Sequence, residues 1–218
     1  MNKPTLTTTA AGLLAAAAVI AGVPAGPAAA DDCPDVELIF ARGTGEPPGV
    51  GRVGQALADA LGPQLGGRSL GVYGVNYPAG LNFLNASSGA DDAAARIADM
   101  GARCPQTRLV LGGFSQGAAA VSMLAGVPPV GDRIGSIGSA PPLPPAAAGQ
   151  VAAVAVFGNP GARFGSPLST TGAFAGRAID VCVEGDPICS AGRDRAAHSA
   201  YELPPYPQQA AAFVAALL

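Results

Sequence analysis

The chain is poor in the side chains that most often bind metals or nucleic acids. Its 218 residues include one histidine, four cysteines and no tryptophan. Lys3 is the only lysine, so the other 11 of the 12 basic residues are arginines, set against 15 acidic residues. No basic patch stands out, which argues against a nucleic acid as partner. No C-x-x-C pair is present and one histidine completes no common zinc ligand set, so we expect no metal and no other cofactor.

Long apolar runs are also missing after the first thirty residues, where no stretch reaches the roughly 18 apolar residues of a membrane-spanning helix. The run over residues 10–22 is shorter than that, follows Lys3, and is followed by three alanines that end at Ala30. This order is typical of a secretory leader with its cleavage site. We therefore predict a cleaved signal peptide over residues 1–30 and a secreted, extracellular domain over 31–218. A retained N-terminal anchor is the alternative.

The four cysteines predict two disulfides, because an even number in an exported protein usually pairs. Three pairings are possible. Cys182 and Cys189 bracket a Gly-Asp-Pro turn, which favours a local bridge between them. Cys33 and Cys104 then form the second bridge, whose long loop would stabilise the fold by about 4 kcal/mol in a chain-entropy treatment.

Segments of strand and helix type alternate along the chain. Strands are predicted over residues 36–41, 71–77, 109–111, 151–157 and 179–183, and helices over 50–61, 91–103, 116–124 and 208–218. The helix that begins at Asp91 is expected to carry acidic residues in its first turn, which suits the helix dipole. The alternation predicts one α/β domain, a parallel sheet covered by helices on both faces.

Two G-x-S-x-G pentapeptides occur, at residues 113–117 and 67–71. In a nucleophile elbow the serine lies where a buried strand turns sharply into a helix, and glycines let the backbones pass closely. The first pentapeptide follows a short apolar run and precedes an alanine-rich stretch that favours a helix. The second lies between a helix-like and a strand-like stretch, which is the opposite order. We therefore predict Ser115 as a nucleophile and Ser69 as a turn residue.

A carboxylate and a base follow Ser115 in the order Ser…Asp…His, which is the chain order of α/β-hydrolases. His198 is the only histidine and therefore the only candidate for the general base. Asp186 is the preferred acid, because it follows a predicted strand and lies in a turn inside the predicted local disulfide. Glu184 is the reserve. The other acidic residues after the serine are Asp132, Asp180, Asp194 and Glu202.

The oxyanion of a tetrahedral intermediate needs backbone N–H donors. One is expected from Gln116, which follows the nucleophile at the start of a helix. The second is expected from the loop over residues 42–46, after the first strand, where Thr44 is our choice because its hydroxyl adds a further donor.

Five segments spread over most of the chain form a joint pattern. They are residues 41–46, 103–105, 112–117, 182–189 and 197–201. Together they resemble the cutinase family of serine esterases, including the cutinase-like proteins of mycobacteria. The resemblance implies an α/β-hydrolase, a three-layer sandwich with five parallel strands and no large lid. It implies Ser115, Asp186 and His198 as triad, Thr44 and Gln116 as oxyanion hole, and the disulfides Cys33–Cys104 and Cys182–Cys189.

One departure from fungal cutinases bears on the substrate. Their loop before the histidine is apolar, whereas residues 190–195 here include Arg193, Asp194 and Arg195. We therefore expect a monomeric esterase for short- to medium-chain acyl esters, whose partners are its small-molecule or lipid substrate and, transiently, lipid surfaces. Alternatives are a lipase or phospholipase, a carbohydrate acetylesterase, and a non-catalytic cell-wall or surface-binding protein.

Overall fold

A computed structural model of the chain describes Met1, residues 33–128 and residues 138–218. Five parallel strands form one sheet in the order β2-β1-β3-β4-β5. They are β1 (Val36–Ala41), β2 (Leu70–Gly74), β3 (Arg108–Phe114), β4 (Val151–Phe157) and β5 (Ala178–Val181). The predicted α/β fold with five parallel strands is confirmed. The predicted leader, apart from Met1, and Asp132 lie outside the described residues.

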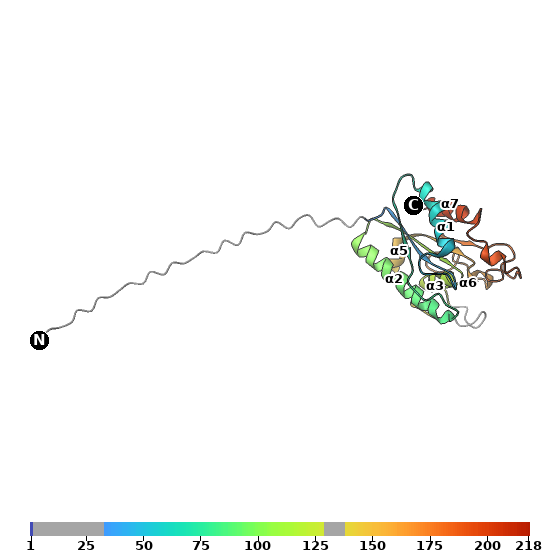
Figure 1. Ribbon diagram of the computed structural model, residues 1–218, viewed down its shortest axis with the longest axis horizontal. Helices are drawn as coiled ribbons and strands as arrows, with labels where there is room; N and C mark the ends of the chain where they lie inside the picture. Colours follow the sequence, from blue (N-terminus) through green and yellow to red (C-terminus); the bar gives the residue numbers. More distant parts are fainter. Residues whose placement is uncertain (2–32, 129–137) are drawn as a thin grey trace. The chain divides into compact units, whose positions relative to one another are not determined.

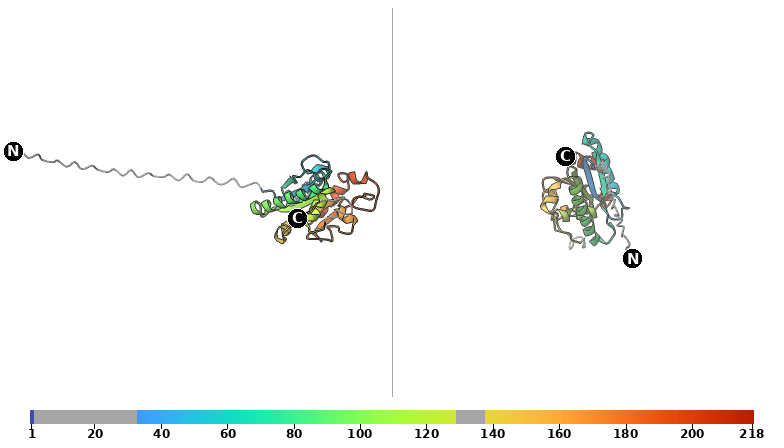
Figure 2. Two further views of the ribbon diagram at one scale, coloured as in Figure 1. Left: turned by 90° about the horizontal axis from the view of Figure 1, so that it is seen from below. Right: turned by 90° about the vertical axis from the view of Figure 1, so that its left-hand side faces the viewer.

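The helices form a layer on each face of the sheet. On one face α1 (Gly51–Leu61) contacts α7 (Tyr206–Ala215), and on the other α2 (Ala86–Arg103) contacts α3 (Gln116–Leu124) (Figure 1). Figure 2 shows the domain from two further directions, with α1 in cyan and α2 in green. The shorter elements are α5 (Pro145–Gln150), α6 (Pro160–Arg163) and the 3-10 helices η1 (Gly62–Leu65), η2 (Phe83–Asn85) and η3 (Ala197–Ser199).

The central strands are buried on both faces, as parallel strands between two helical layers must be. In β1, Leu38 and Phe40 belong to the apolar cluster that includes residues of α1 and α7. Ile39 and Ala41 point the other way, into the cluster with α2 and α3. The alternation follows from the two-residue repeat of a strand, which places successive side chains on opposite faces of the sheet.

α2 begins at Ala86, five residues before the predicted start, because Ala86 is itself fully buried and extends the helix's apolar face. Asp91 and Asp92 therefore lie in the second turn, and the prediction that acidic residues occupy the first turn was wrong. Asp92 instead accepts hydrogen bonds from the Tyr73 hydroxyl (3.0 Å) and the Asn76 N–H (2.8 Å). Asp92 therefore holds β2 and the residues after it in place, and it does not interact with the dipole at the start of α2.

The two disulfides join Cys33 to Cys104 and Cys182 to Cys189. The first ties the residues before β1 to the end of α2. The second closes a short loop after β5. Both pairings are the ones that the sequence predicts, and no described cysteine is free.

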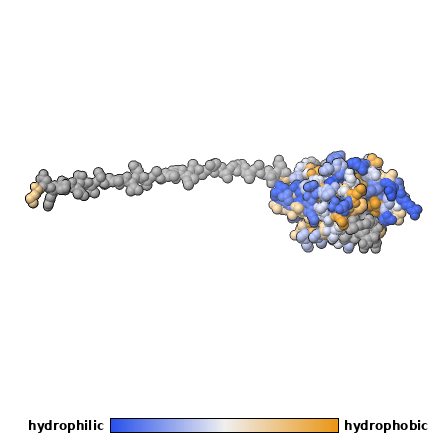
Figure 3. All heavy atoms as spheres, turned by 60° about the horizontal axis from the view of Figure 1, so that its bottom comes forward, coloured by the Kyte–Doolittle hydropathy of each residue, from blue (hydrophilic) through white to orange (hydrophobic). Residues whose placement is uncertain are grey.

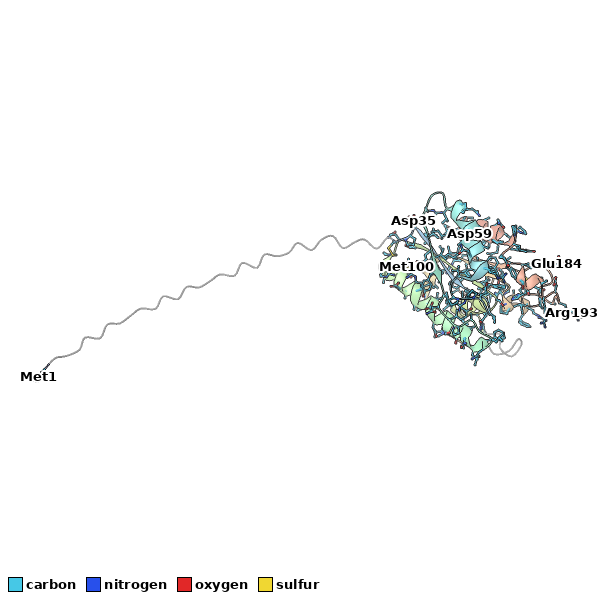
Figure 4. The ribbon with its side chains drawn as sticks, viewed as in Figure 1. Met1, Asp35, Asp59, Met100, Glu184 and Arg193 are labelled. Atoms are coloured by element: carbon cyan, nitrogen blue, oxygen red, sulfur yellow. A yellow bond between two sulfur atoms is a disulfide. The ribbon has the colours of Figure 1, made fainter. Side chains whose placement is uncertain are left out.

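The two ends of the sheet differ in what they carry. Asp35 precedes β1 and lies at the end of the domain that also holds Met100, whereas Glu184 and Arg193 lie at the other end (Figure 4). Since β1 starts beside Asp35, the Glu184 end is where the strands have their carboxyl ends. Open α/β sheets bind their ligands at that edge.

Candidate active site

Ser115 lies on a sharp turn between β3 and α3 with backbone angles φ 54° and ψ −110°. A non-glycine residue with positive φ is strained, and such strain is common at functional sites. The turn is possible because the residues two positions before and two positions after Ser115 are glycines. A Cβ on Gly117 would lie 1.9 Å from the carbonyl oxygen of Ala41, and one on Gly113 would lie 2.5 Å from the backbone of Gly117. The elbow therefore needs both glycines.

His198 lies on η3 and reaches Ser115 from 83 residues further along the chain. Its Nε2 is 2.9 Å from Ser115 Oγ, and its Nδ1 is 2.8 Å from Asp186 Oδ2. A carboxylate accepts and cannot donate, so Nδ1 carries the proton and Nε2 is the acceptor for the serine hydroxyl. The imidazole lies beside the Phe114 ring, with the ring centres 5.0 Å apart. The three predicted residues are thus brought together in one hydrogen-bonded row.

Asp186 is fully buried, yet it has donors for both carboxylate oxygens. Oδ1 accepts from the Ile188 N–H at 2.7 Å, and Oδ2 accepts from His198 and from the hydroxyl of Tyr201. Burial raises the pKa of Asp186, but the hydrogen bonds from His198, Tyr201 and Ile188 outweigh it and hold the pKa below the ordinary value. The carboxylate is therefore ionised at neutral pH.

The other acidic residues after the serine are occupied elsewhere. Glu184, the reserve acid, is exposed. Asp180 accepts from the Asn159 side chain and from the Ser169 N–H, Asp194 accepts from the Ala196 N–H, and Glu202 pairs with Arg52. Within the described ranges, Asp186 is the acid that contacts the histidine.

The two residues expected at the oxyanion hole lie next to each other. Thr44 Oγ1 donates to Gln116 Oε1 at 3.4 Å, and Gln116 Nε2 donates to the Gly80 carbonyl oxygen at 3.4 Å. Gln116 is the first residue of α3, where a backbone N–H has no partner within the helix. The loop after β1, the start of α3 and the loop at Gly80 therefore meet beside Ser115.

The loop after β1 is held by two charged side chains, Arg42 and Glu46, whose roles the sequence alone did not predict. The Glu46 carboxylate accepts from the Gly43 N–H at 2.6 Å. Arg42 is only 3% exposed, and its guanidinium donates to the carbonyl oxygens of Val75 and Tyr77. These carbonyls belong to the segment predicted as the end of β2, where the Val75 N–H still donates to the Phe40 carbonyl oxygen at 3.0 Å but its own carbonyl oxygen accepts from the arginine. The available signal was an arginine and a glutamate on either side of Gly-Thr-Gly, directly after a buried strand.

Two negative observations apply to the described part of the chain. No group of three or more His, Cys, Asp or Glu side chains gathers there as a set of metal ligands. No helix among residues 33–128 and 138–218 is long and apolar enough to cross a membrane.

Comparisons with known proteins find similarity over most of the chain. The family model described as Cutinase matches residues 32–218. "Phospholipase Culp4" of Mycobacterium tuberculosis is 48% identical over 211 residues, which are 96% of this chain and 90% of that protein. "Carboxylesterase Culp1" of Mycobacterium bovis is 41% identical over 213 residues, 93% of this chain and 91% of that protein. A solved structure of Trichoderma reesei cutinase with a C11Y4 phosphonate inhibitor has a TM-score of 0.67 and 36% identity, covering 86% of this chain and 78% of that one.

Proposed function

This chain belongs to the cutinase family and is a serine carboxylic ester hydrolase, and from that premise we propose that it hydrolyses short- to medium-chain acyl esters with Ser115, His198 and Asp186 as its triad. One observation carries the assignment of roles: the hydrogen-bonded row from Ser115 Oγ through the imidazole to the buried carboxylate. No other histidine is present in the sequence to act as the base.

The reaction has two steps, acylation of Ser115 and hydrolysis of the acyl-enzyme, and His198 acts as the base in both. His198 Nε2 takes the proton of Ser115 as Oγ bonds to the ester carbonyl carbon. The bond to the alcohol oxygen then breaks, and the alcohol leaves with that proton. Water attacks the resulting acyl-enzyme and gives its proton to the same nitrogen. The bond between Ser115 Oγ and the acyl carbon then breaks, Ser115 takes that proton back from His198, and the acid is released. Asp186 keeps Nδ1 protonated and offsets the positive charge that the ring gains in each step.

We assign the oxyanion to the backbone N–H groups of Gln116 and Thr44. The position of Gln116 at the start of α3 supports this role, since unpaired N–H groups and the helix dipole both favour negative charge there. Glu46 contributes to the position of the Thr44 N–H, because its carboxylate accepts from the Gly43 N–H and so fixes the backbone next to Thr44.

The surroundings of Ser115 support an acyl chain of limited length. Next to Gly80, on the oxyanion side, Leu81, Phe83 and Leu84 are exposed and offer an apolar rim. Figure 3 shows apolar residues, in orange, set among hydrophilic ones on the face that it presents. The loop before His198 instead exposes Arg193 and Arg195. A long waxy chain that covered this loop would desolvate the charges, at a cost on the order of kcal/mol for each one left unpaired.

A second candidate substrate is a phospholipid. The relative Culp4 is named a phospholipase, which supports this reading. The exposed guanidinium groups of Arg193 and Arg195 add a reason of their own, because arginine is well suited to bind a phosphate. Short phospholipids therefore belong in the same assay.

We expect hydrolysis rates on p-nitrophenyl esters, from acetate to palmitate, to peak at short or medium chains, with little acid released from cutin. The double variant Arg193→Leu/Arg195→Leu should raise the rate on the longest esters relative to butyrate by up to roughly thirtyfold, since each of the two charges removed spares about 1 kcal/mol of desolvation and about 1.4 kcal/mol is a factor of ten. Asp194 is kept, because its side chain caps the Ala196 N–H. Fast cutin breakdown by the unaltered protein, or an unchanged chain-length profile in the variant, would contradict the substrate assignment. A loss of phospholipid hydrolysis in the variant would favour the second candidate.

We also propose that residues 1–30 direct export and are removed. The two disulfides and the family support an extracellular location, since disulfides persist in oxidising compartments. N-terminal sequencing of the protein from the culture medium should begin at Asp31. A mature protein that begins at Met1 and stays with the cells would instead favour the retained anchor.

A further inference from the structure

Tyr201 is a fully buried polar side chain for which the reaction steps above give no role. It follows His198 by three residues, at the point where η3 has ended. Its ring lies among aromatic rings from three other elements, with centre-to-centre distances of 5.5 Å to Phe114, 6.0 Å to Phe157 and 6.1 Å to Tyr206. This packing directs the hydroxyl at the carboxylate of Asp186.

The direction of the hydrogen bonds at the Tyr201 hydroxyl follows from its neighbours. The Val183 N–H lies 3.2 Å away and can only donate to it. Cys189 Sγ also lies 3.2 Å away, but a disulfide sulfur carries no hydrogen. The phenolic proton therefore goes to Asp186 Oδ2, the oxygen that also accepts from His198. Burial, together with the neighbouring carboxylate, raises the pKa of Tyr201 far above its ordinary range, so this proton is kept.

We infer that Tyr201 is a positioning residue of the reaction: its hydroxyl fixes the Asp186 carboxylate and sets how strongly the Asp186–His198 pair holds a proton. The inference rests on the proposed triad. With the Ile188 N–H on Oδ1 and Tyr201 on Oδ2, each oxygen has a donor other than the histidine. These two donors hold the carboxylate in the orientation in which Oδ2 meets His198 Nδ1.

The hydroxyl also tunes the pair, because a carboxylate shares its charge among its donors. With Tyr201 in place, part of the charge on Oδ2 is taken up by the phenol. Without it, His198 is the remaining side-chain donor, and the pair retains its extra proton to a higher pH. Only a neutral His198 can accept the proton of Ser115, so the rate would then rise later with pH.

Tyr206, from α7, is a titratable group that acts on Tyr201, and His198 is one that acts on Asp186. Arg163, from α6, donates to the carbonyl oxygen of Pro187 and so places a cation beside the residue that follows Asp186. Phe114 from β3, Phe157 from β4 and the Cys182–Cys189 bridge also border the group, and none of them titrates.

The test is the pH profile of kcat/KM on p-nitrophenyl butyrate. In Tyr201→Phe we expect kcat to fall about tenfold, as for the loss of one hydrogen bond to a charged group, with KM little changed. We also expect the acid limb of the profile to move to higher pH by roughly half a unit to one unit, because one stabilising hydrogen bond to the carboxylate is lost. The matched control is Tyr206→Phe, which removes the same atom from a neighbouring ring. The described residues offer the Tyr206 hydroxyl no hydrogen-bond partner, so its rate and profile should stay normal.

A second substitution keeps the volume of the ring and so protects the test against misfolding. Replacement of Tyr201 by 3,5-difluorotyrosine makes the phenol a stronger donor and should move the acid limb to lower pH, opposite to Tyr201→Phe. A merely structural side chain would give no such opposed shifts. A normal rate and profile in Tyr201→Phe, or an unshifted profile with the fluorinated residue, would overturn the inference. If hydrolysis did not depend on Ser115, the proposed triad would fail instead, so the two failures can be told apart.

Discussion

Ser115→Ala should lower kcat/KM for p-nitrophenyl butyrate by roughly four to six orders of magnitude, as expected when a serine nucleophile is lost while the rest of its site stays intact. The serine oxygen is the atom that His198 Nε2 meets at 2.9 Å, so no acyl-enzyme forms without it. The fold should survive, because alanine fits wherever serine does and Ser115 makes no side-chain cap for α3. Circular dichroism and the melting temperature check this.

The matched control is Ser69→Ala, in the second G-x-S-x-G pentapeptide. Ser69 Oγ donates to Asp35 Oδ2 at 2.8 Å and accepts from the Asp35 N–H at 2.9 Å. Asp35 lies at the end of the domain opposite to Glu184 (Figure 4). This variant should keep its activity and lose at most a little thermal stability. A serine-directed phosphonate should label the unaltered protein and Ser69→Ala at Ser115, and should not label Ser115→Ala. Inactivity of a folded Ser69→Ala would contradict the assignment.

Asp186→Asn should lower kcat by about four orders of magnitude, as the same change does in another serine hydrolase. An amide that keeps its oxygen toward the Ile188 N–H turns its NH2 group toward His198 Nδ1. The imidazole must then accept at Nδ1 and carry its proton on Nε2, where it cannot take the proton of Ser115. If the amide is instead turned over, its NH2 group faces the Ile188 N–H, and two donors meet without an acceptor. In both orientations we expect kcat to fall.

Glu184→Gln is the matched control for this change, since it removes a nearby carboxylate that is exposed. It should keep near-normal kcat. A normal rate in Asp186→Asn together with a large loss in Glu184→Gln would make Glu184 the acid and overturn our choice.

Asp186→Asn should also change how the stability of the protein depends on pH in the acid range. The hydrogen bonds hold the pKa of Asp186 below the value of 3.8 that an unfolded aspartate has. A lowered pKa in the folded state stabilises the protein above that value, and the contribution is lost as the pH falls through the lowered pKa. The free energy of unfolding of the unaltered protein should therefore decrease in that acid range, and the Asp186→Asn variant should lack this part of the decrease.

How much of the site is readable from the sequence depends on how local each feature is. Ser115 is readable because its neighbours on both sides carry the signal: an apolar run, two glycines and an alanine-rich helix former within a few residues. The start of α2 was misjudged because the burial of Ala86 is decided by the apolar cluster that it joins, not by its neighbours in the chain. The predicted end of β2 was wrong for a similar reason, since the carbonyl oxygens of Val75 and Tyr77 accept from Arg42, which lies more than thirty residues earlier in the chain.

The sequence by itself determined the fold class and singled out Ser115 and His198 as the proposed nucleophile and base, because strand and helix patterns are local and only one histidine exists. It left six acidic residues after Ser115 and expressed only a preference among them. The tertiary structure brought one of these, Asp186, to His198, and it alone set Tyr201 against that carboxylate. Such contacts arise because Ser115 follows β3 and Asp186 follows β5 at the same edge of the sheet, where η3 places His198 between them. A hydrogen bond of less than 3 Å depends on how whole elements pack together, and no spacing along the chain encodes that distance.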